Sequence, residues 1–335
     1  MTGGEARWIS GADVRRLLIT LAIVTGAVAA AYLGVSAAAW DQITAVDGSC
    51  LATRTSQTPA NFVGAWDQET GPFVDAAPFH FDANDVSFPS LTPGLTLRAW
   101  WAKPQDGGDR VVIVVHGKNS CRRDATSLLP AGMLARAGFG VLVPDLRDHG
   151  ESDREDGHWA GGTDEWQDVL GTWRWLRDQG YAADRIGLYG GSMGAGSVSI
   201  AMGREPAVAA AFLDSAYANI LEASTFYAEA NDRPTWLVPG ALFVGGIIGG
   251  DDLLGASPAD YFRTRLAGRP VFIVHGDADE TIDVSQGKAL AKAAGEGGTV
   301  VEPWILEGVE HVQAAFVEPG EYEERLTGFF DKALR

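Results

Sequence analysis

The sequence predicts an α/β protein built on a doubly wound, mostly parallel sheet. Strand-type and helix-type segments alternate from about residue 85 to the end of the chain. Residues 111–115 are five consecutive valines and isoleucines, and a run without alternation is typical of a strand buried on both faces of a parallel sheet. A glycine-rich turn at residues 190–194 joins another such strand to a helix. Ligands of these sheets bind at the carboxyl ends of the strands.

The individual elements follow from their apolar patterns. An antiparallel pair is expected at 86–90 and 95–101, around a Pro-Gly turn. The later strands are expected at 111–115, 140–143, just before Gly190, 209–213, 271–274 and 299–306. Helices are expected at 124–137, at 164–179, directly after Ser192, and at 321–334.

One connection, from residue 213 to residue 271, is too long for a simple crossover. Its aromatic and apolar residues predict a cap over the strand ends, inserted at about 215–258. Residues 236–248 are strongly apolar, but the run is too short to cross a membrane and contains Pro239 and Gly240. A packed part of the cap is therefore expected there.

Composition and charge limit the class of protein. The 335 residues are 46% hydrophobic, which suffices for one large domain with a well-filled core. There are 44 acidic and 26 basic residues, a net charge of −18, which repels nucleic acid and anionic lipid head groups. No nucleic-acid partner is expected.

The amino-terminal region predicts a membrane anchor. Residues 17–40 contain no charged side chain and are long enough to cross a bilayer as a helix. Three arginines precede this run, and Asp41 and Asp47 follow it, so residues 1–16 are expected in the cytoplasm and the rest outside. The small residues at 36–39 leave a cleaved signal peptide, and hence a secreted protein, as the alternative.

Residues 41–84 are expected to form an extended segment that packs on the main domain through its aromatic side chains, with the domain itself at 85–335. Cys50 and Cys121 both fall on the oxidising side of the membrane, where they form either a disulfide or two free thiols. No histidine or cysteine cluster has metal-ligand spacing, so no metal is expected.

The turn at residues 190–194 has the pattern G-x-S-x-G, with Ser192 at its centre. A serine on so tight a strand-to-helix turn is held in a strained conformation with its hydroxyl exposed, and glycines two residues away avoid collisions. A serine hydroxyl needs a base, and the base needs a carboxylate to orient it. His311 alone among the six histidines follows the last strand, while Asp277, Asp279 and Asp283 follow the strand at 271–274.

From about residue 85 onward the chain resembles an α/β-hydrolase of the serine-esterase and serine-peptidase-like group. The resemblance rests on four motifs in family order: His116-Gly117, the D-x-R-x-H-G-x-S segment at 145–152, the turn at 190–194, and H-G-x-x-D-x-x-I at 275–282. Asp148 stands where the family often has glycine, a difference that would alter a loop near the site.

This resemblance implies the role of each site residue. Ser192 would be the nucleophile, His311 the base, and Asp279, rather than Asp277, the acid. The backbone N–H groups of Met193 and Lys118 would form the oxyanion hole. The family pattern requires neither a metal nor an organic cofactor. Serine at the turn excludes the dehalogenases of this fold, which carry aspartate there.

The expected activity is hydrolysis of a small-molecule carboxylic ester, thioester or amide through an acyl-enzyme. A peptidase acting on short peptides would use the same residues and stays open as an alternative. A membrane-tethered binding protein without activity is the alternative from another class. The remaining motif histidines, His116, His149 and His275, are expected to stabilise turns by bonding to the backbone. Oligomeric state is not indicated.

Overall fold

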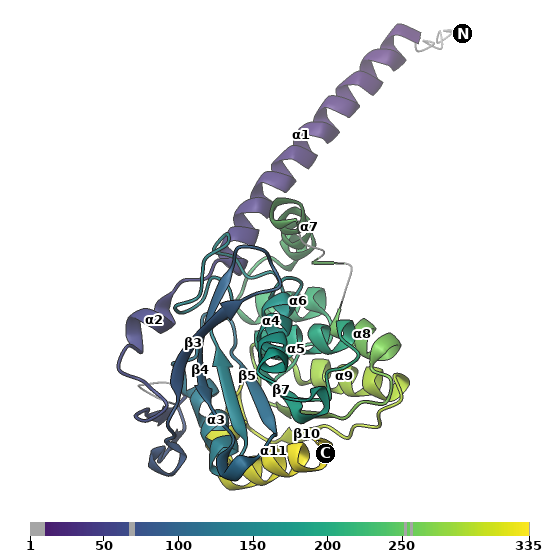
Figure 1. The fold of residues 1–335 in the computed structure, drawn as a ribbon. Coiled ribbons are helices and arrows are strands. Elements are labelled where there is room, and N and C mark those ends of the chain that lie inside the picture. Colours follow the sequence, from purple (N-terminus) through teal and green to yellow (C-terminus); the bar gives the residue numbers. More distant parts are fainter. Residues whose placement is uncertain (1–10, 67–70, 251–252, 255–256, 335) are drawn as a thin grey trace, which may run out of the picture.

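The computed structural model describes residues 11–66, 71–250, 253–254 and 257–334. Its centre is an eight-stranded sheet in the order β10-β9-β8-β7-β5-β6-β4-β3, in which every pairing from β10 to β6 is parallel (Figure 1). The strands β4 and β6, and β3 and β4, pair antiparallel. The strands are β3 (Asn84–Pro89), β4 (Thr96–Ala102), β5 (Val111–Val115), β6 (Gly140–Pro144), β7 (Ile186–Gly191), β8 (Ala210–Asp214), β9 (Val271–Gly276) and β10 (Trp304–Leu306). The predicted fold class is confirmed.

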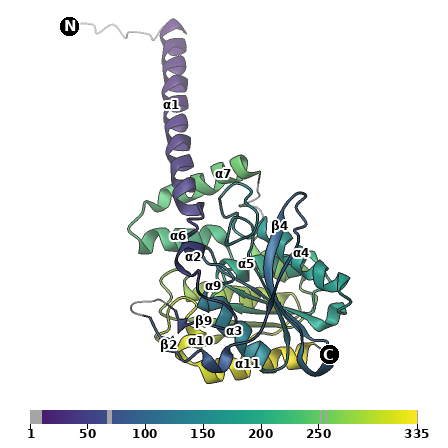
Figure 2. The same cartoon turned by 60° about the vertical axis from the view of Figure 1, so that its left-hand side comes forward.

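Helices cover both faces of this sheet, and two apolar cores result. One core lies under α4 (Glu165–Asp178), α5 (Met193–Arg204), α8 (Pro258–Arg265) and α9 (Val284–Glu296). The other lies under α3 (Ala125–Arg136), α10 (Ala314–Val317) and α11 (Pro319–Ala333) (Figure 2). All residues of the four central strands are buried, which explains their apolar runs without alternation.

The sequence prediction was wrong about the length of the last strand. Only Trp304–Leu306 pairs with β9, although the apolar run begins at residue 299. Pro303 has no N–H to donate to a ladder, and Val300 is 96% exposed. Helix α9 was not predicted, because most of its buried residues are alanine, glycine and glutamine rather than large apolar side chains.

The amino-terminal part is one long helix, α1 (Gly11–Thr44), that projects away from the domain (Figures 1 and 2). Among the described residues it is the one helix long and apolar enough to cross a membrane, and its most apolar window is not buried in the protein. Only Ser36, Trp40 and Thr44 of this helix are buried.

The segment after α1 contains α2 (Ser49–Thr53), the short antiparallel pair β1 (Gly64–Ala65) and β2 (Phe73–Val74), and a 3-10 turn, η1 (Ala77–Phe79). Phe62 and Phe79 are buried in the core under α3. Cys50 and Cys121 form a disulfide, with 5.9 Å between their Cα atoms. Of the two states left open for these cysteines, the structure therefore has the disulfide.

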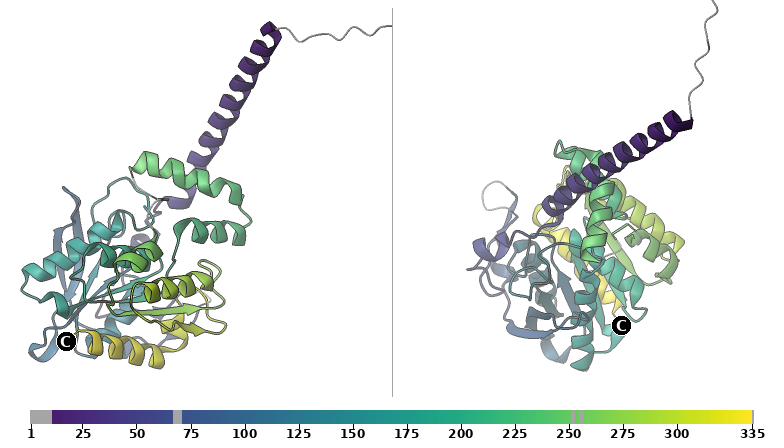
Figure 3. Two further views of the ribbon diagram at one scale, coloured as in Figure 1. Left: turned by 90° about the vertical axis from the view of Figure 1, so that its right-hand side faces the viewer. Right: turned by 90° about the horizontal axis from the view of Figure 1, so that it is seen from above.

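Between β8 and α8 lie α6 (Ile220–Ala230), the 3-10 turn η4 (Thr235–Leu237) and α7 (Val238–Gly249). Figure 3 shows α7 lying across α1, with α6 between α7 and the domain. Val238 and Leu242 of α7 share an apolar cluster with Ile220 and Ala223 of α6. The carboxyl end of α1 and these two helices therefore meet above one edge of the domain.

Candidate active site

Ser192 lies at the sharp turn between β7 and α5. Its backbone has φ 54° and ψ −121°, a conformation that residues other than glycine rarely adopt. A Cβ atom on Gly190 would lie 2.5 Å from the Gly194 carbonyl, and one on Gly194 would lie 2.4 Å from the Val115 carbonyl oxygen. Both positions therefore require glycine, and the strained turn leaves the Ser192 side chain partly exposed.

The structure brings the three predicted side chains together. His311 Nε2 lies 2.8 Å from Ser192 Oγ, and His311 Nδ1 lies 2.7 Å from Asp279 Oδ2. Ser192 follows β7, Asp279 follows β9, and His311 follows β10. Because the carboxyl ends of these parallel strands meet at one edge of the sheet, residues 119 positions apart are in hydrogen-bonding distance.

Asp279 is buried, and both of its carboxylate oxygens have hydrogen-bonding partners. Its Oδ1 accepts hydrogen bonds from the backbone N–H groups of Thr281 and Ile282, at 2.9 and 2.8 Å. Its Oδ2 also lies 3.2 Å from His275 Nε2. Burial by itself would raise the pKa of the Asp279 carboxyl, but the hydrogen bonds from His275 and His311 outweigh it and hold the pKa well below its usual range. The carboxyl is therefore ionised at neutral pH.

The two competing carboxylates have structural roles. Asp277 is exposed and accepts a hydrogen bond from the Gly308 N–H at 2.7 Å, which ties together the loops after β9 and β10. Asp283 caps the amino terminus of α9 by accepting from the Ser285 N–H at 2.9 Å. Neither has a hydrogen bond to His311, and of the three predicted aspartates, all in the described part of the chain, Asp279 is the one that lies within hydrogen-bonding distance of this imidazole.

A buried polar network holds the loop that carries His311. The Val312 N–H donates to Ser215 Oγ at 3.0 Å, and Ser215 Oγ donates to Asp214 Oδ1 at 3.2 Å. Tyr322 of α11 donates to Asp214 Oδ2 at 2.7 Å. Burial raises the pKa of Asp214 to about 6. Sequence reasoning missed this network, although Asp214 and Ser215 directly follow a strand run, the same position that marked Asp279.

The predicted oxyanion donors lie beside the nucleophile. A Cβ atom on Gly117 would lie 3.3 Å from Ser192 Cβ, so the loop that begins with His116 passes directly against the serine. In the described part of the chain, neither the Met193 nor the Lys118 backbone N–H has a recorded hydrogen-bond acceptor. Met193 is the first residue of α5, where the helix dipole favours negative charge.

Two adjoining cavities, of about 220 and 490 Å³, share Ser192 and His311 in their walls. The larger is walled by the end of α1 through Gln42 and Ile43, and by α6 through Ile220 and Tyr227. Lys118 Nζ donates to the Ile43 carbonyl. The amino-terminal segment therefore forms part of the wall around the candidate nucleophile, which the sequence did not indicate.

The motif at 145–152 builds the turn after β6. Asp145 accepts from the backbone N–H groups of Arg122 and Glu151, at 2.7 and 2.9 Å. Asp148 has φ 63°, in the left-handed region that favours glycine. Its carboxylate accepts from Glu155 and Gly157 N–H groups. The Asp148 side chain is therefore held within its own loop.

The motif histidines bond to the backbone as predicted. His116 Nε2 accepts from the Leu146 N–H at 3.0 Å, and His149 Nδ1 lies 2.7 Å from the Arg147 carbonyl oxygen. Burial lowers the pKa of His116 to about 4 and that of His149 to about 3, so both are neutral at pH 7. His275 Nε2 also bonds to the Ile282 carbonyl at 2.9 Å, but its contact with Asp279 adds a role that was not predicted.

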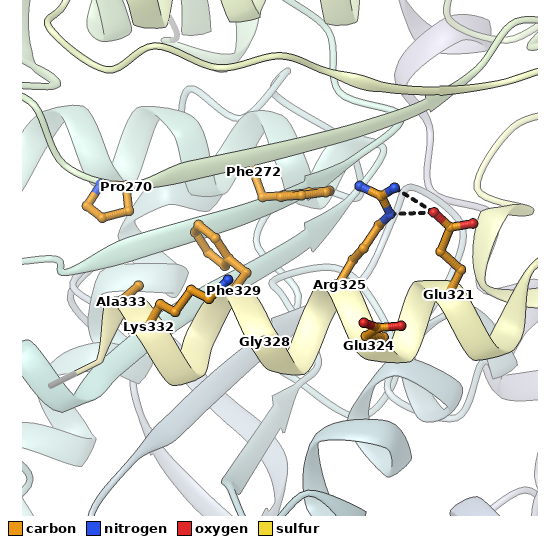
Figure 4. A pocket seen from close by; sticks show the side chains of 9 residues that line it. All are labelled: Pro270, Phe272, Glu321, Glu324, Arg325, Gly328, Phe329, Lys332 and Ala333. Carbon is orange, nitrogen blue, oxygen red and sulfur yellow. Dashed lines mark hydrogen bonds and ion pairs between the residues drawn. The ribbon is translucent and has the colours of Figure 1, made fainter.

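A larger pocket, of about 730 Å³, lies elsewhere, between α11 and strand β9 (Figure 4). Arg325 and Glu321 are hydrogen-bonded in its wall, near Phe272 and Phe329. No predicted site residue lines it. Among the described residues, no cluster of histidine, cysteine, aspartate or glutamate side chains could hold a metal ion.

Several solved structures have the same fold as this chain. An esterase of Pyrococcus furiosus has a TM-score of 0.61 and 23% identity, over 78% of this chain and 97% of its own. An α/β hydrolase of a Penicillium species has a TM-score of 0.60 and 18% identity, over 76% and 99%. An acylaminoacyl peptidase of Pyrococcus horikoshii has a TM-score of 0.57 and 20% identity, over 76% of this chain and 42% of its own. The fold is that of the α/β-hydrolases.

Residues 127–335, more than half of the chain, match the model of the prolyl oligopeptidase family. The chain therefore belongs to this family, and it is a serine hydrolase. No sequence among the curated proteins matches the chain.

Proposed function

We propose that this protein is a membrane-anchored serine hydrolase that cleaves a carboxylic ester, or a thioester or amide, through an acyl-enzyme on Ser192. The observation that carries the proposal is the continuous chain of short hydrogen-bonding distances from Ser192 through His311 to Asp279, 2.8 and 2.7 Å. Membership of the prolyl oligopeptidase family supports the same chemistry.

In this mechanism His311 Nε2 accepts the proton of Ser192 as its oxygen attacks the carbonyl carbon of the substrate. The N–H groups of Met193 and Lys118 stabilise the oxyanion, and Asp279 stabilises the imidazolium. His311 then gives its proton to the leaving group as the bond to the carbonyl carbon breaks. A water molecule gives a proton to His311 as it attacks the carbonyl carbon of the acyl-enzyme. The bond from that carbon to Ser192 Oγ then breaks, His311 returns the proton to Oγ, and the acid is released.

A peptidase that acts on short peptides is the second candidate, and the family match is the observation that favours it. Both substrate classes would be bound in the cavities beside Ser192, whose walls mix apolar residues with Lys118 and Arg233. A choice between them requires substrate profiles.

The test is labelling of the full-length protein with a fluorophosphonate, followed by assays with p-nitrophenyl esters of increasing chain length and with aminoacyl anilides. We expect labelling of the wild type and none of Ser192→Ala. Ser285→Ala, which changes an exposed serine on α9, is the matched control and should label fully. Labelling that persists in Ser192→Ala would refute the assignment, and a preference for anilides would favour the peptidase.

We also propose that α1 is an uncleaved anchor, with residues 1–16 in the cytoplasm and the hydrolase domain, residues 85–335, outside. Residues 41–84 then connect the two, and 215–258 form the cap. The length and apolar surface of α1 support the anchor. The mass of the mature protein on a blot tests it, since a cleaved signal peptide would remove about the first forty residues.

A further inference from the structure

Helix α7 carries an apolar face that the protein leaves uncovered. Phe243 is 52% exposed and Ile247 is 66% exposed, and they lie one helical turn apart. Trp236, in η4 just before α7, is 62% exposed. No charged residue occurs from residue 235 to residue 250. A surface helix normally places charged and polar residues on its outer face, so this face is adapted to surroundings other than water.

The other sides of α7 are occupied. A Cβ atom on Gly240 would lie 2.3 Å from Ser36 Oγ, and one on Gly245 would lie 2.2 Å from the Trp40 ring, so both glycines permit close packing against α1. Leu242 is buried in the cluster shared with α6. Therefore α7 is fixed between the anchor helix and the domain, and the face that carries Phe243 and Ile247 is left free.

The contact between α7 and α1 lies where the membrane span should end. About 20 residues cross the hydrocarbon core, so a span that begins at Leu17 ends near Ser36. Tyr32 stacks on Trp236 at 5.8 Å between ring centroids, and its hydroxyl donates to the Trp236 carbonyl at 3.1 Å. Trp40 is one turn beyond Ser36. Aromatic side chains of this kind concentrate at the membrane–water interface.

We propose that η4 and α7 lie in the outer interface of the membrane, with Trp236, Phe243 and Ile247 in contact with lipid. The proposal rests on the anchor in the proposed function. The partner is the lipid surface of the leaflet that α1 crosses, because α7 packs directly against the outer end of that span. Since the chain carries a net charge of −18, apolar insertion rather than attraction to anionic head groups holds the helix there.

The placement has a consequence for the candidate active site. The cavity beside Ser192 is walled by Gln42 and Ile43 at the end of α1 and by Tyr227 of α6, the helix beneath α7. The part of the cavity wall formed by these residues is thereby held close to the leaflet surface. Esters that partition into the membrane would reach Ser192 without crossing bulk water.

The disulfide between the two native cysteines permits a direct test, since an introduced cysteine is then the single free thiol. Phe243→Cys and Ile247→Cys in the full-length protein are labelled with an environment-sensitive fluorophore and reconstituted into phosphatidylcholine vesicles. Leu21→Cys, within the proposed span, is the lipid control, and Val300→Cys, on a distant exposed segment, is the water control. Thermal melts verify that each labelled variant is folded.

We expect brominated lipids to quench the labels at 243, 247 and 21 several-fold more strongly than the label at 300, and iodide to show the reverse order. If the labels at 243 and 247 behave like the one at 300 but lipid quenches the label at 21, the proposal for α7 is overturned and the anchor is upheld. A label at 21 that faces water would overturn both. Labels at 243 and 247 shielded from both quenchers would indicate a second copy or another protein on this face and would also overturn it. None of these readouts depends on hydrolase activity.

Discussion

At the scale of single residues, the proposed mechanism depends on an ionised Asp279 carboxylate beside His311. Hydrogen bonds from His275 and His311 hold the pKa of this carboxyl well below its usual range although the group is buried. We expect Asp279→Asn to lower kcat on a p-nitrophenyl ester by roughly 10³–10⁴-fold, because the amide no longer stabilises the imidazolium. Steady-state kinetics measure this loss.

Asp277→Asn is the matched control, since it makes the same chemical change two residues away at a carboxylate that bonds to Gly308. Its kcat should remain close to the wild-type value. An equal loss in both variants would mean that the loop, and not the carboxylate at 279, was damaged.

The buried carboxyl group of Glu165 should make the stability of the folded protein depend on pH. Glu165 is buried and accepts from the N–H groups of Ala160 and Gly162 at 2.9 and 2.8 Å. Burial raises the pKa of Glu165 to about 7. Because this pKa is higher in the folded state than in the unfolded state, protonated Glu165 stabilises the fold. The contribution is complete below the unfolded-state pKa, near 4.5, and is lost as pH rises through 7.

We therefore expect Glu165→Gln, which cannot titrate, to remove this loss. Between pH 4.5 and pH 8 the free energy of unfolding of the wild type should fall relative to that of the variant by about 2–3 kcal/mol. Denaturant unfolding at several pH values measures the difference, and any constant offset from the lost hydrogen bond cancels. A difference that is independent of pH would contradict the assignment.

At the scale of elements, the loop between β10 and α10 positions His311 through contacts made by other elements. Ser215→Ala would remove the acceptor of the buried Val312 N–H. We expect a loss of about 1–3 kcal/mol in stability, because a buried donor is left unsatisfied. The rate of fluorophosphonate labelling should fall as well, since the imidazole is less well placed.

The matched control is Ser199→Ala on α5, which removes a buried hydroxyl that bonds only within its own helix. It should leave the labelling rate close to that of the wild type. A similar slowing in both variants would show that the effect is general loss of packing rather than displacement of the His311 loop.

At the scale of the whole molecule, the disulfide fixes the segment after α1 to the domain. Cys50 and Cys121 are 71 residues apart in sequence, so the bond restricts a long loop in the unfolded chain. We expect the double variant Cys50→Ser, Cys121→Ser to lose about 2–5 kcal/mol in stability. Thermal unfolding of the wild type with and without reductant gives an independent measurement. An unchanged melting temperature in both experiments would contradict this role.

Across the whole molecule, most features that depend on neighbouring residues were predicted from the sequence, and several features that depend on distant residues were not. The order of the eight main-sheet strands along the chain was predicted because their apolar patterns are local, whereas helix α9 was missed. The length of the edge strand β10 was overestimated. This strand can pair only with its single neighbour β9, and Pro303 has no N–H to extend that pairing. The network around Asp214 and Ser215 was not predicted, because its partners Val312 and Tyr322 are about 100 residues away in sequence.

The sequence by itself determined the α/β class, the strained turn at Ser192, and the apolar length of the amino-terminal helix, because each depends on residues that are neighbours in the chain. The family resemblance pointed to Asp279, but only the tertiary structure placed it against His311. The tertiary structure alone decided that Cys50 and Cys121 are joined and that α7 packs on α1. These depend on where distant segments meet, and the twist of the sheet and the packing of helices on its faces set those distances.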